Sequence, residues 1–158
     1  MKIAISSDFA GYQLKEWLKK SLIEAGYEIM DVNDGKNWEK IDYVAAATNL
    51  VAGMRTDGCS KGIIVCGTGA GVSIAANKFK GSYGVPCESL FTAESAAVIN
   101  NSNVLALGAR VVGCENALKM AEIWLKSSLC SEFTTERREF VTGLYQKLLE
   151  TEQRNMRE

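Results

Sequence analysis

The residues best suited to chemistry lie together in residues 66–73, which read CGTGAGVS. Cys66 ends an apolar run, and three alternating glycines follow it before a helical pattern begins. Glycines let a backbone approach a ligand closely, and successive N–H groups at the start of a helix attract an anion. The positive end of a helix also favours the thiolate form of a nearby cysteine. Such a loop suits the removal of a proton from a carbon beside a carbonyl, while its amides hold the enediolate oxygen.

Other interpretations of this loop stay open from the residues alone. A cysteine at the end of a strand is often only a small buried apolar residue. Alternating glycines also occur in dinucleotide-binding loops, but the third glycine of GxGxxG is missing here. No Gly-Lys-Ser/Thr follows, so the loop is not a P-loop either.

The composition narrows the chemistry further. The chain has 158 residues and no histidine, which excludes Ser-His-Asp and Cys-His catalysis and most zinc sites. Acid–base work must therefore fall to Cys, Asp, Glu, Lys or Tyr. No acidic or cysteine cluster has the spacing of metal ligands, and enediolate chemistry requires no metal or other cofactor. A net charge of −1 provides no basic surplus for binding nucleic acid.

The chain is expected to be a cytoplasmic protein. No stretch approaches the ~20 apolar residues of a membrane span, and no signal peptide precedes the first strand-like segment. A reducing compartment implies that the five cysteines are thiols. Apart from Cys66, they are expected to be packing residues: Cys59, Cys87, Cys114 and Cys130.

The elements that must position the loop follow from hydrophobic periodicity. Apolar runs predict strands over residues 2–6, 27–32, 62–66, 84–88 and 103–108. Periodic patterns predict helices over residues 11–26, 41–54, 72–78, 92–100, 115–129 and 135–154, and residues 33–37 read as a polar turn.

This alternation predicts an α/β fold, namely a doubly wound, Rossmann-like three-layer sandwich with a five-stranded parallel sheet. We expect residues 1–158 to form one domain, with its ligand site at the carboxyl ends of the strands. Pro86 cannot donate a ladder hydrogen bond, so its strand is expected at an edge or with a bulge.

Three separated blocks resemble the family of ribose-5-phosphate isomerase B and galactose-6-phosphate isomerase. They are SSDFAGYQLK at 6–15, CGTGAGVSIAANKF at 66–79 and NVLALGARVVG at 103–113, and the resemblance extends over residues 1–141. It implies an aldose–ketose isomerase of a phosphorylated sugar, of the ribose 5-phosphate/ribulose 5-phosphate type, acting through a cis-enediolate. It also implies a homodimer or dimer of dimers with sites built from two subunits, and a helix near 135–154 at the dimer interface.

The same resemblance implies roles for individual residues. Cys66 matches the base that moves the proton, and Thr68 matches a hydroxyl that assists at the other end of the transfer. Asp8, Tyr43 and Asn100 match substrate contacts, and Arg110 matches a phosphate contact. The amides expected to bind the enediolate belong to Gly67, Gly69, Gly71, Val72 and Ser73.

Two substrate-site positions depart from the family. Phe9 stands where the family has a histidine beside the phosphate, and Ile99 where a histidine opens the sugar ring. Arg137 and Arg138 are expected to replace lost phosphate contacts, because a guanidinium binds phosphate with paired hydrogen bonds. The alternative is that both arginines are only solvent-facing residues on the surface of a helix.

The loss of the ring-opening histidine leads to a hypothesis about the substrate. Because Ile99 cannot move a proton, the preferred substrate is one with a large open-chain fraction, such as a ketose phosphate or a tetrose phosphate. The alternative is that Asp8, Tyr43 or a group of the partner subunit replaces the histidine. Galactose-6-phosphate isomerase and a non-catalytic sugar-phosphate-binding subunit remain alternative functions.

Overall fold

Five parallel strands form the centre of the molecule in the computed structural model, which describes residues 1–34 and 37–156. The strand order is β2-β1-β3-β5-β4, and every neighbouring pair runs in parallel. The strands are β1 (Lys2–Ser7), β2 (Glu28–Asp31), β3 (Lys61–Cys66), β4 (Gly84–Pro86) and β5 (Val104–Gly108). The predicted α/β fold with a five-stranded parallel sheet is therefore confirmed. Among the described residues β4 pairs only with β5, so Pro86 lies in an edge strand, the first of its two predicted settings.

Helices cover both faces of this sheet. The helices are α1 (Tyr12–Glu24), α2 (Tyr43–Thr56), α3 (Ala70–Ala76), α4 (Leu90–Val98), α5 (Cys114–Lys126) and α6 (Thr135–Asn155). One apolar core joins α1, α4 and α5 to the sheet, and the other joins α2 and α3 to its opposite face. On β3, Ile63 and Val65 belong to the first core and Ile64 and Cys66 to the second, as the alternation of a strand requires.

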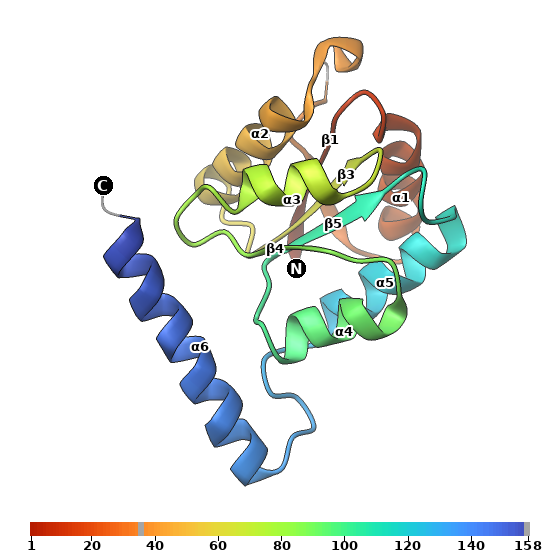
Figure 1. The fold of residues 1–158 in the computed structure, drawn as a ribbon. Helices are drawn as coiled ribbons and strands as arrows, with labels where there is room; N and C mark the ends of the chain where they lie inside the picture. Colours follow the sequence, from red (N-terminus) through yellow and green to blue (C-terminus); the bar gives the residue numbers. More distant parts are fainter. Residues whose placement is uncertain (35–36, 157–158) are drawn as a thin grey trace.

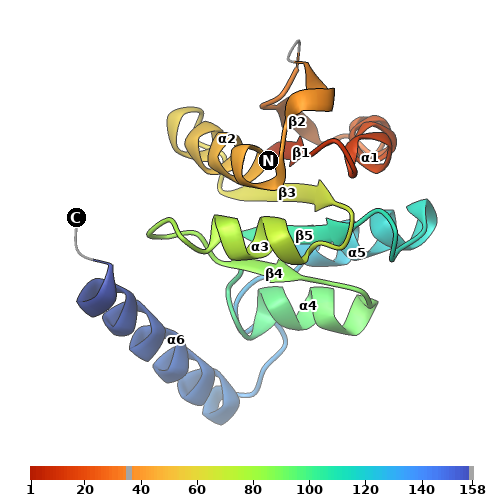
Figure 2. The same cartoon turned by 45° about the horizontal axis from the view of Figure 1, so that its top comes forward.

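The helix α6 lies apart from these layers. Both views of the fold show it projecting from the body of the molecule (Figures 1 and 2). Val141 is its one buried residue, whereas Phe140, Leu144 and Leu148 are exposed. Near its end, Glu152 accepts hydrogen bonds from the Gly81 amide at 2.7 Å and the Tyr83 hydroxyl at 2.9 Å. A long helix with an exposed apolar side is typical of a surface that another chain covers.

Helix starts differ from the predicted ones where a capping side chain was not recognised. The helix α2 begins at Tyr43 because the Asp42 carboxylate accepts a hydrogen bond from the Ala45 amide at 2.8 Å. In the same way, Ser89 accepts from the Thr92 amide at 3.1 Å and starts α4 at Leu90, two residues before the predicted start.

The segment after β2 and one cysteine differ from the expectations. A short 3-10 helix, η1 (Trp38–Lys40), follows β2 and was not predicted. Part of the expected polar turn at 33–37 lies outside the described residues. The expectation of packing roles holds for Cys59, Cys87 and Cys130, which are buried, but is wrong for Cys114. Cys114 is exposed because it begins α5, where the first turn faces solvent.

Candidate active site

The carboxyl ends of β1, β3 and β5 bring three loops together at one edge of the sheet. Backbone hydrogen bonds tie each loop to β3 or to the turn that follows it. The Asp8 amide donates to the Val65 carbonyl at 3.1 Å, and the Ala109 amide donates to the Cys66 carbonyl at 2.8 Å. The Arg110 amide donates to the Gly67 carbonyl at 3.0 Å. The loop around Cys66 is therefore held on both sides by neighbouring backbone.

Two glycines allow this close approach. A Cβ atom on Gly11 would lie 2.4 Å from the Val65 carbonyl oxygen, and one on Gly108 would lie 2.6 Å from the Thr68 carbonyl carbon. In both cases the obstacle is backbone, which cannot rotate away as a side chain can. Neither glycine was recognised as a site residue from the sequence, because the backbone that each one touches lies far away in the chain.

We expect Gly11→Ala to destabilise the protein by about 1–3 kcal/mol, the usual cost of overpacking, and to lower its activity as the loop shifts. Gly113→Ala is the matched control, since nothing lies within 4 Å of a Cβ added there. Urea unfolding monitored by circular dichroism measures both variants. Equal urea midpoints for the two variants would show that the loop of Gly11 can move away from Val65 without loss of stability.

Cys66 lies at the end of β3 with only 4% of its surface exposed. Its Sγ accepts a hydrogen bond from the Gly69 amide at 3.0 Å. Gly69 adopts the left-handed conformation, with φ of 80°, which turns this amide back toward the sulfur and starts α3. An N–H donor aimed at a sulfur atom stabilises a negative charge on it.

Other groups of the loop are arranged around the thiol. The exposed Thr68 hydroxyl accepts from the Ala70 amide at 3.4 Å. Within residues 1–34 and 37–156, the amides of Gly67, Gly71 and Val72 donate to no acceptor. They are the donors of the loop that a bound anion can use.

The polar groups of Ser73 already have hydrogen-bond partners inside α3. Its amide already donates to the Gly69 carbonyl at 3.3 Å inside the first turn of α3, and its hydroxyl donates to the Ala70 carbonyl at 2.8 Å. This amide is therefore already used inside α3, which begins at Ala70, and its expected role toward an enediolate stays a prediction. The amide of Gly69 is likewise used, by Cys66.

Asp8 contributes a buried carboxylate to the same edge. Its Oδ1 accepts from the amides of Ala10 and Gly11, both at 2.9 Å. Burial raises the pKa of Asp8 above its usual value, although these two amides and the positive charge of Arg110 oppose the shift. Asp8 Oδ2 accepts no hydrogen bond from the described part of the chain, which leaves it for a ligand hydroxyl.

Tyr43 and Arg110 lie beside the loop of Cys66, and Phe9 follows Asp8 in the chain. The Tyr43 ring lies beside Gly71, where an added Cβ would come within 3.2 Å of it, and 47% of Tyr43 is exposed. Arg110 Nε lies 3.7 Å from the Cβ position of Gly67, on the other side of the loop. Phe9, the residue after Asp8, is 54% exposed and therefore presents an apolar surface to solvent.

Four expected site residues lie elsewhere in the chain. Ile99 and Asn100 follow α4 at the amino end of the strands, and Asn100 lines a cavity of about 500 Å³ together with Gly84, the first residue of β4. Arg137 and Arg138 lie in the first turn of α6. Cys130 connects this turn to the end of α4: its amide donates to the Val98 carbonyl at 2.9 Å, and its thiol lies 3.8 Å from the Arg138 carbonyl. One chain therefore does not bring these four residues to Cys66.

The described residues contain no group of three or more Cys, Asp or Glu side chains placed to hold a metal ion. In the same part of the chain, no helix combines the length and the apolar character needed to cross a membrane.

Comparison with known proteins places this arrangement in a family. The Ribose/Galactose Isomerase family matches residues 3–141. The 4-deoxy-4-sulfo-D-erythrose isomerase of Clostridium sp. (strain MSTE9) is 36% identical over 94% of this chain and 93% of its own. The ribose-5-phosphate isomerase B of Escherichia coli (strain K12) is 38% identical over 92% of this chain and 97% of its own.

A solved structure agrees with the sequence comparisons. Ribose-5-phosphate isomerase B of Clostridium thermocellum superposes with a TM-score of 0.86 at 35% identity, covering 98% of this chain and 99% of that one. The expected family is confirmed: the chain belongs to the Ribose/Galactose Isomerase family, and its class of activity is that of an aldose–ketose isomerase.

Proposed function

We propose that the protein interconverts the aldose and ketose forms of a sugar that carries a terminal anion, with Cys66 as the base. The observation that carries this proposal is the buried thiol at the end of β3, followed by a loop whose Gly67, Gly71 and Val72 amides donate to no acceptor in the described part of the chain. A base and a set of fixed N–H donors are the two requirements for forming an enediolate.

The proposed reaction moves one proton between adjacent carbons. The Cys66 thiolate takes the proton from C2 of the aldose, and the C–H electron pair forms the C1–C2 double bond while the carbonyl oxygen becomes an anion. The loop amides hold that oxygen. The thiol then returns the proton to C1, while the O2 hydroxyl proton passes to O1 through the Thr68 hydroxyl, and O2 becomes the ketose carbonyl.

The proposed site is completed by a second subunit. In one chain, Asn100, Arg137 and Arg138 lie far from Cys66, whereas α6 leaves the body and exposes an apolar side. A two-fold dimer covers such a surface and brings one end of a chain to the other end of its partner. Arg137 and Arg138 then join Arg110 in binding the terminal anion, which is the dimer or dimer-of-dimers arrangement that the resemblance implies.

The proposed substrate reaches the site in its open-chain form. No subunit of a homo-oligomer can supply an imidazole, since the chain has no histidine, and Ile99 is apolar. A tetrose whose C4 hydroxyl is phosphorylated or absent cannot close a furanose ring, so it needs no ring-opening group. The relative that acts on 4-deoxy-4-sulfo-D-erythrose supports this preference over ribose 5-phosphate.

Isomerisation in D₂O tests both parts of the proposal. The substrates are ribose 5-phosphate, erythrose 4-phosphate, 4-deoxy-4-sulfo-erythrose and galactose 6-phosphate, with deuterium entry at C1 and C2 followed by NMR. We expect exchange with a higher kcat/KM for the two tetroses. Equal rates without a lag for ribose 5-phosphate would contradict the open-chain preference, and no exchange with any sugar would favour a non-catalytic binding subunit.

A mixing experiment tests the shared site. Cys66→Ala and Asn100→Ala chains, each of low activity alone, are unfolded together and refolded. Because half of the dimers are then mixed and each mixed dimer holds one intact site, activity should return to about a quarter of the wild-type value. The same variants refolded separately are the control, and a mixture no more active than their average would show that Asn100 does not act in the partner subunit's site.

A further inference from the structure

The peptide unit between Ser7 and Asp8 is held from both sides. Its N–H, that of Asp8, donates to the Val65 carbonyl of β3 at 3.1 Å. Its carbonyl, that of Ser7, accepts from the side-chain amide of Asn33 at 3.1 Å. This peptide unit directly precedes the carboxylate of Asp8, so its orientation sets where that carboxylate points.

The side chain of Asn33 replaces a backbone hydrogen bond between β2 and β1. β2 pairs with β1 as far as Asp31 opposite Ile5, and the Val32 amide donates to the Ile5 carbonyl at 3.1 Å. Carbonyls of a strand face the same neighbour at every second residue, so the Ser7 carbonyl is the next one on that side. The strand β2 has ended by then, and Asn33 Nδ2 supplies the donor that its backbone no longer provides.

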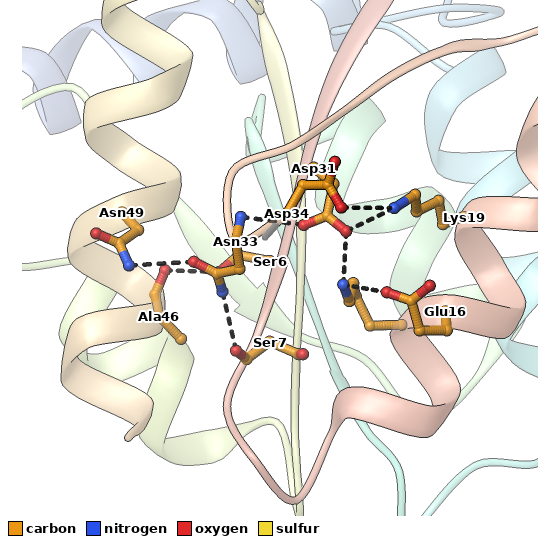
Figure 3. A network of polar contacts seen from close by, with 10 residues as sticks. Ser6, Ser7, Glu16, Lys19, Asp31, Asn33, Asp34, Ala46 and Asn49 are labelled. Atoms are coloured by element: carbon orange, nitrogen blue, oxygen red, sulfur yellow. Dashed lines mark hydrogen bonds and ion pairs between the residues drawn. The ribbon is translucent and has the colours of Figure 1, made fainter. Parts of the chain in front are cut away.

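Asn33 is itself fixed by a buried network (Figure 3). It is 5% exposed, its Nδ2 also donates to Ser6 Oγ at 2.9 Å, and its Oδ1 accepts from Asn49 Nδ2 at 3.1 Å. Ser6 Oγ in turn donates to the Ala46 carbonyl of α2 at 2.9 Å. The same helix begins with Tyr43, which rests on Gly71 of the Cys66 loop.

A buried side chain with this many partners cannot rotate without losing several hydrogen bonds at once. Its position therefore fixes the end of β1 relative to α2. Asp8 directly follows the first of these elements and Tyr43 begins the second. The Asp8 amide donates to the carbonyl of Val65, the residue before Cys66, and the Tyr43 ring lies beside Gly71.

We propose that Asn33 is a positioning residue of the active site. Through the Ser7 carbonyl it sets the orientation of Asp8, and through its contacts with α2 it sets the position of Asp8 relative to Tyr43. The proposal rests on the proposed function, because Asp8 is taken to bind a substrate hydroxyl. A displacement of about 1 Å at such a group lowers catalysis by up to roughly 100-fold.

A double-mutant cycle separates positioning from simple stabilisation. Asn33→Ala is expected to lower kcat/KM by about 10-fold in the wild type, chiefly through KM, but less than about 2-fold when Asp8 is already asparagine. Lys61→Met is the matched control. Lys61 Nζ also donates two hydrogen bonds, to the Trp124 and Ser127 carbonyls, but it lies at the amino end of β3, away from Cys66 at the carboxyl end. Its effect on kcat/KM should be small and the same in both backgrounds.

Asn33→Asp is a second variant that keeps the volume of the side chain but removes the donors to Ser6 and Ser7. It should reproduce the rise in KM. An Asn33 effect of equal size with and without the Asp8 carboxylate would overturn the proposal, as would failure of both Asn33 variants to fold, which would assign Asn33 to the sheet alone. An inactive wild type would instead contradict the proposed function.

Discussion

Cys66→Ala is expected to lower kcat by about 100- to 10,000-fold, the usual contribution of a general base, while KM changes little. In the proposed mechanism the thiol takes the proton from the sugar, whereas the loop amides proposed to hold the sugar remain in the variant. Deuterium exchange at C2 should disappear together with the overall reaction. The measurement is steady-state kinetics with the best tetrose substrate, followed by NMR in D₂O.

Cys87→Ala is the matched control for this experiment. Cys87 is also a buried cysteine that directly follows a strand, and its amide donates to the Ala106 carbonyl at 3.0 Å. Burial raises the pKa of Cys87 to about 11, so it is a neutral thiol at the pH of the assay. We expect near-normal kinetics from this variant, and a loss as large as that of Cys66→Ala would indicate that packing, not proton transfer, explains both.

Asp31→Asn is expected to destabilise the protein by about 3–5 kcal/mol at pH 7, the range found when one partner of a buried ion pair is removed. Asp31 Oδ2 accepts from Lys15 Nζ at 2.6 Å and from Lys19 Nζ at 2.9 Å. The side chains of Lys15 and Asp31 are only 2% and 4% exposed. An asparagine would leave the buried Lys15 ammonium with Glu16 as its one carboxylate partner in the described part of the chain.

The size of this effect should depend on pH. Burial acts to raise the pKa of Asp31, but the hydrogen bonds and charges of Lys15 and Lys19 outweigh it and hold the pKa below the usual value of 3.8. A carboxyl group with a lowered pKa in the folded state stabilises the protein fully above its unfolded pKa. The contribution is lost as the pH falls through the folded pKa, so wild type and variant should converge in acid below 3.8.

Urea unfolding from pH 7 down to pH 3 measures this convergence. The exposed pair of Lys20 and Glu24, with nitrogen and oxygen 3.9 Å apart, provides a control variant, Glu24→Gln, which should change stability by no more than about 1 kcal/mol. A constant difference between wild type and Asp31→Asn over the whole range would show that the charge of Asp31 is not what stabilises the fold. Because Asp31 Oδ1 also accepts from the Asn33 amide at 3.0 Å, the variant should raise KM as well.

Local patterns were sufficient for the architecture. Each strand is a short apolar run and each helix repeats its apolar residues with a helical period, so their order alone specified a parallel sheet with helices on both faces. The edge position of β4 followed from Pro86, since proline lacks the N–H that a central strand must donate. The loop of Cys66 was also recognisable, because its residues are consecutive in the chain.

Contacts between distant segments could not be derived in this way. Asn33 and the Ser7 carbonyl, or Gly11 and Val65, meet only because parallel strands align their carboxyl ends. The first turn of α3 decided that the Ser73 amide is used inside the helix. The separation of Asn100, Arg137 and Arg138 from Cys66 is likewise a property of topology: α4 returns the chain to the amino ends of the strands before these residues occur. The sequence by itself determined which groups can do the chemistry, and the tertiary structure decided which of them one chain brings together, because that depends on the path of the backbone through space.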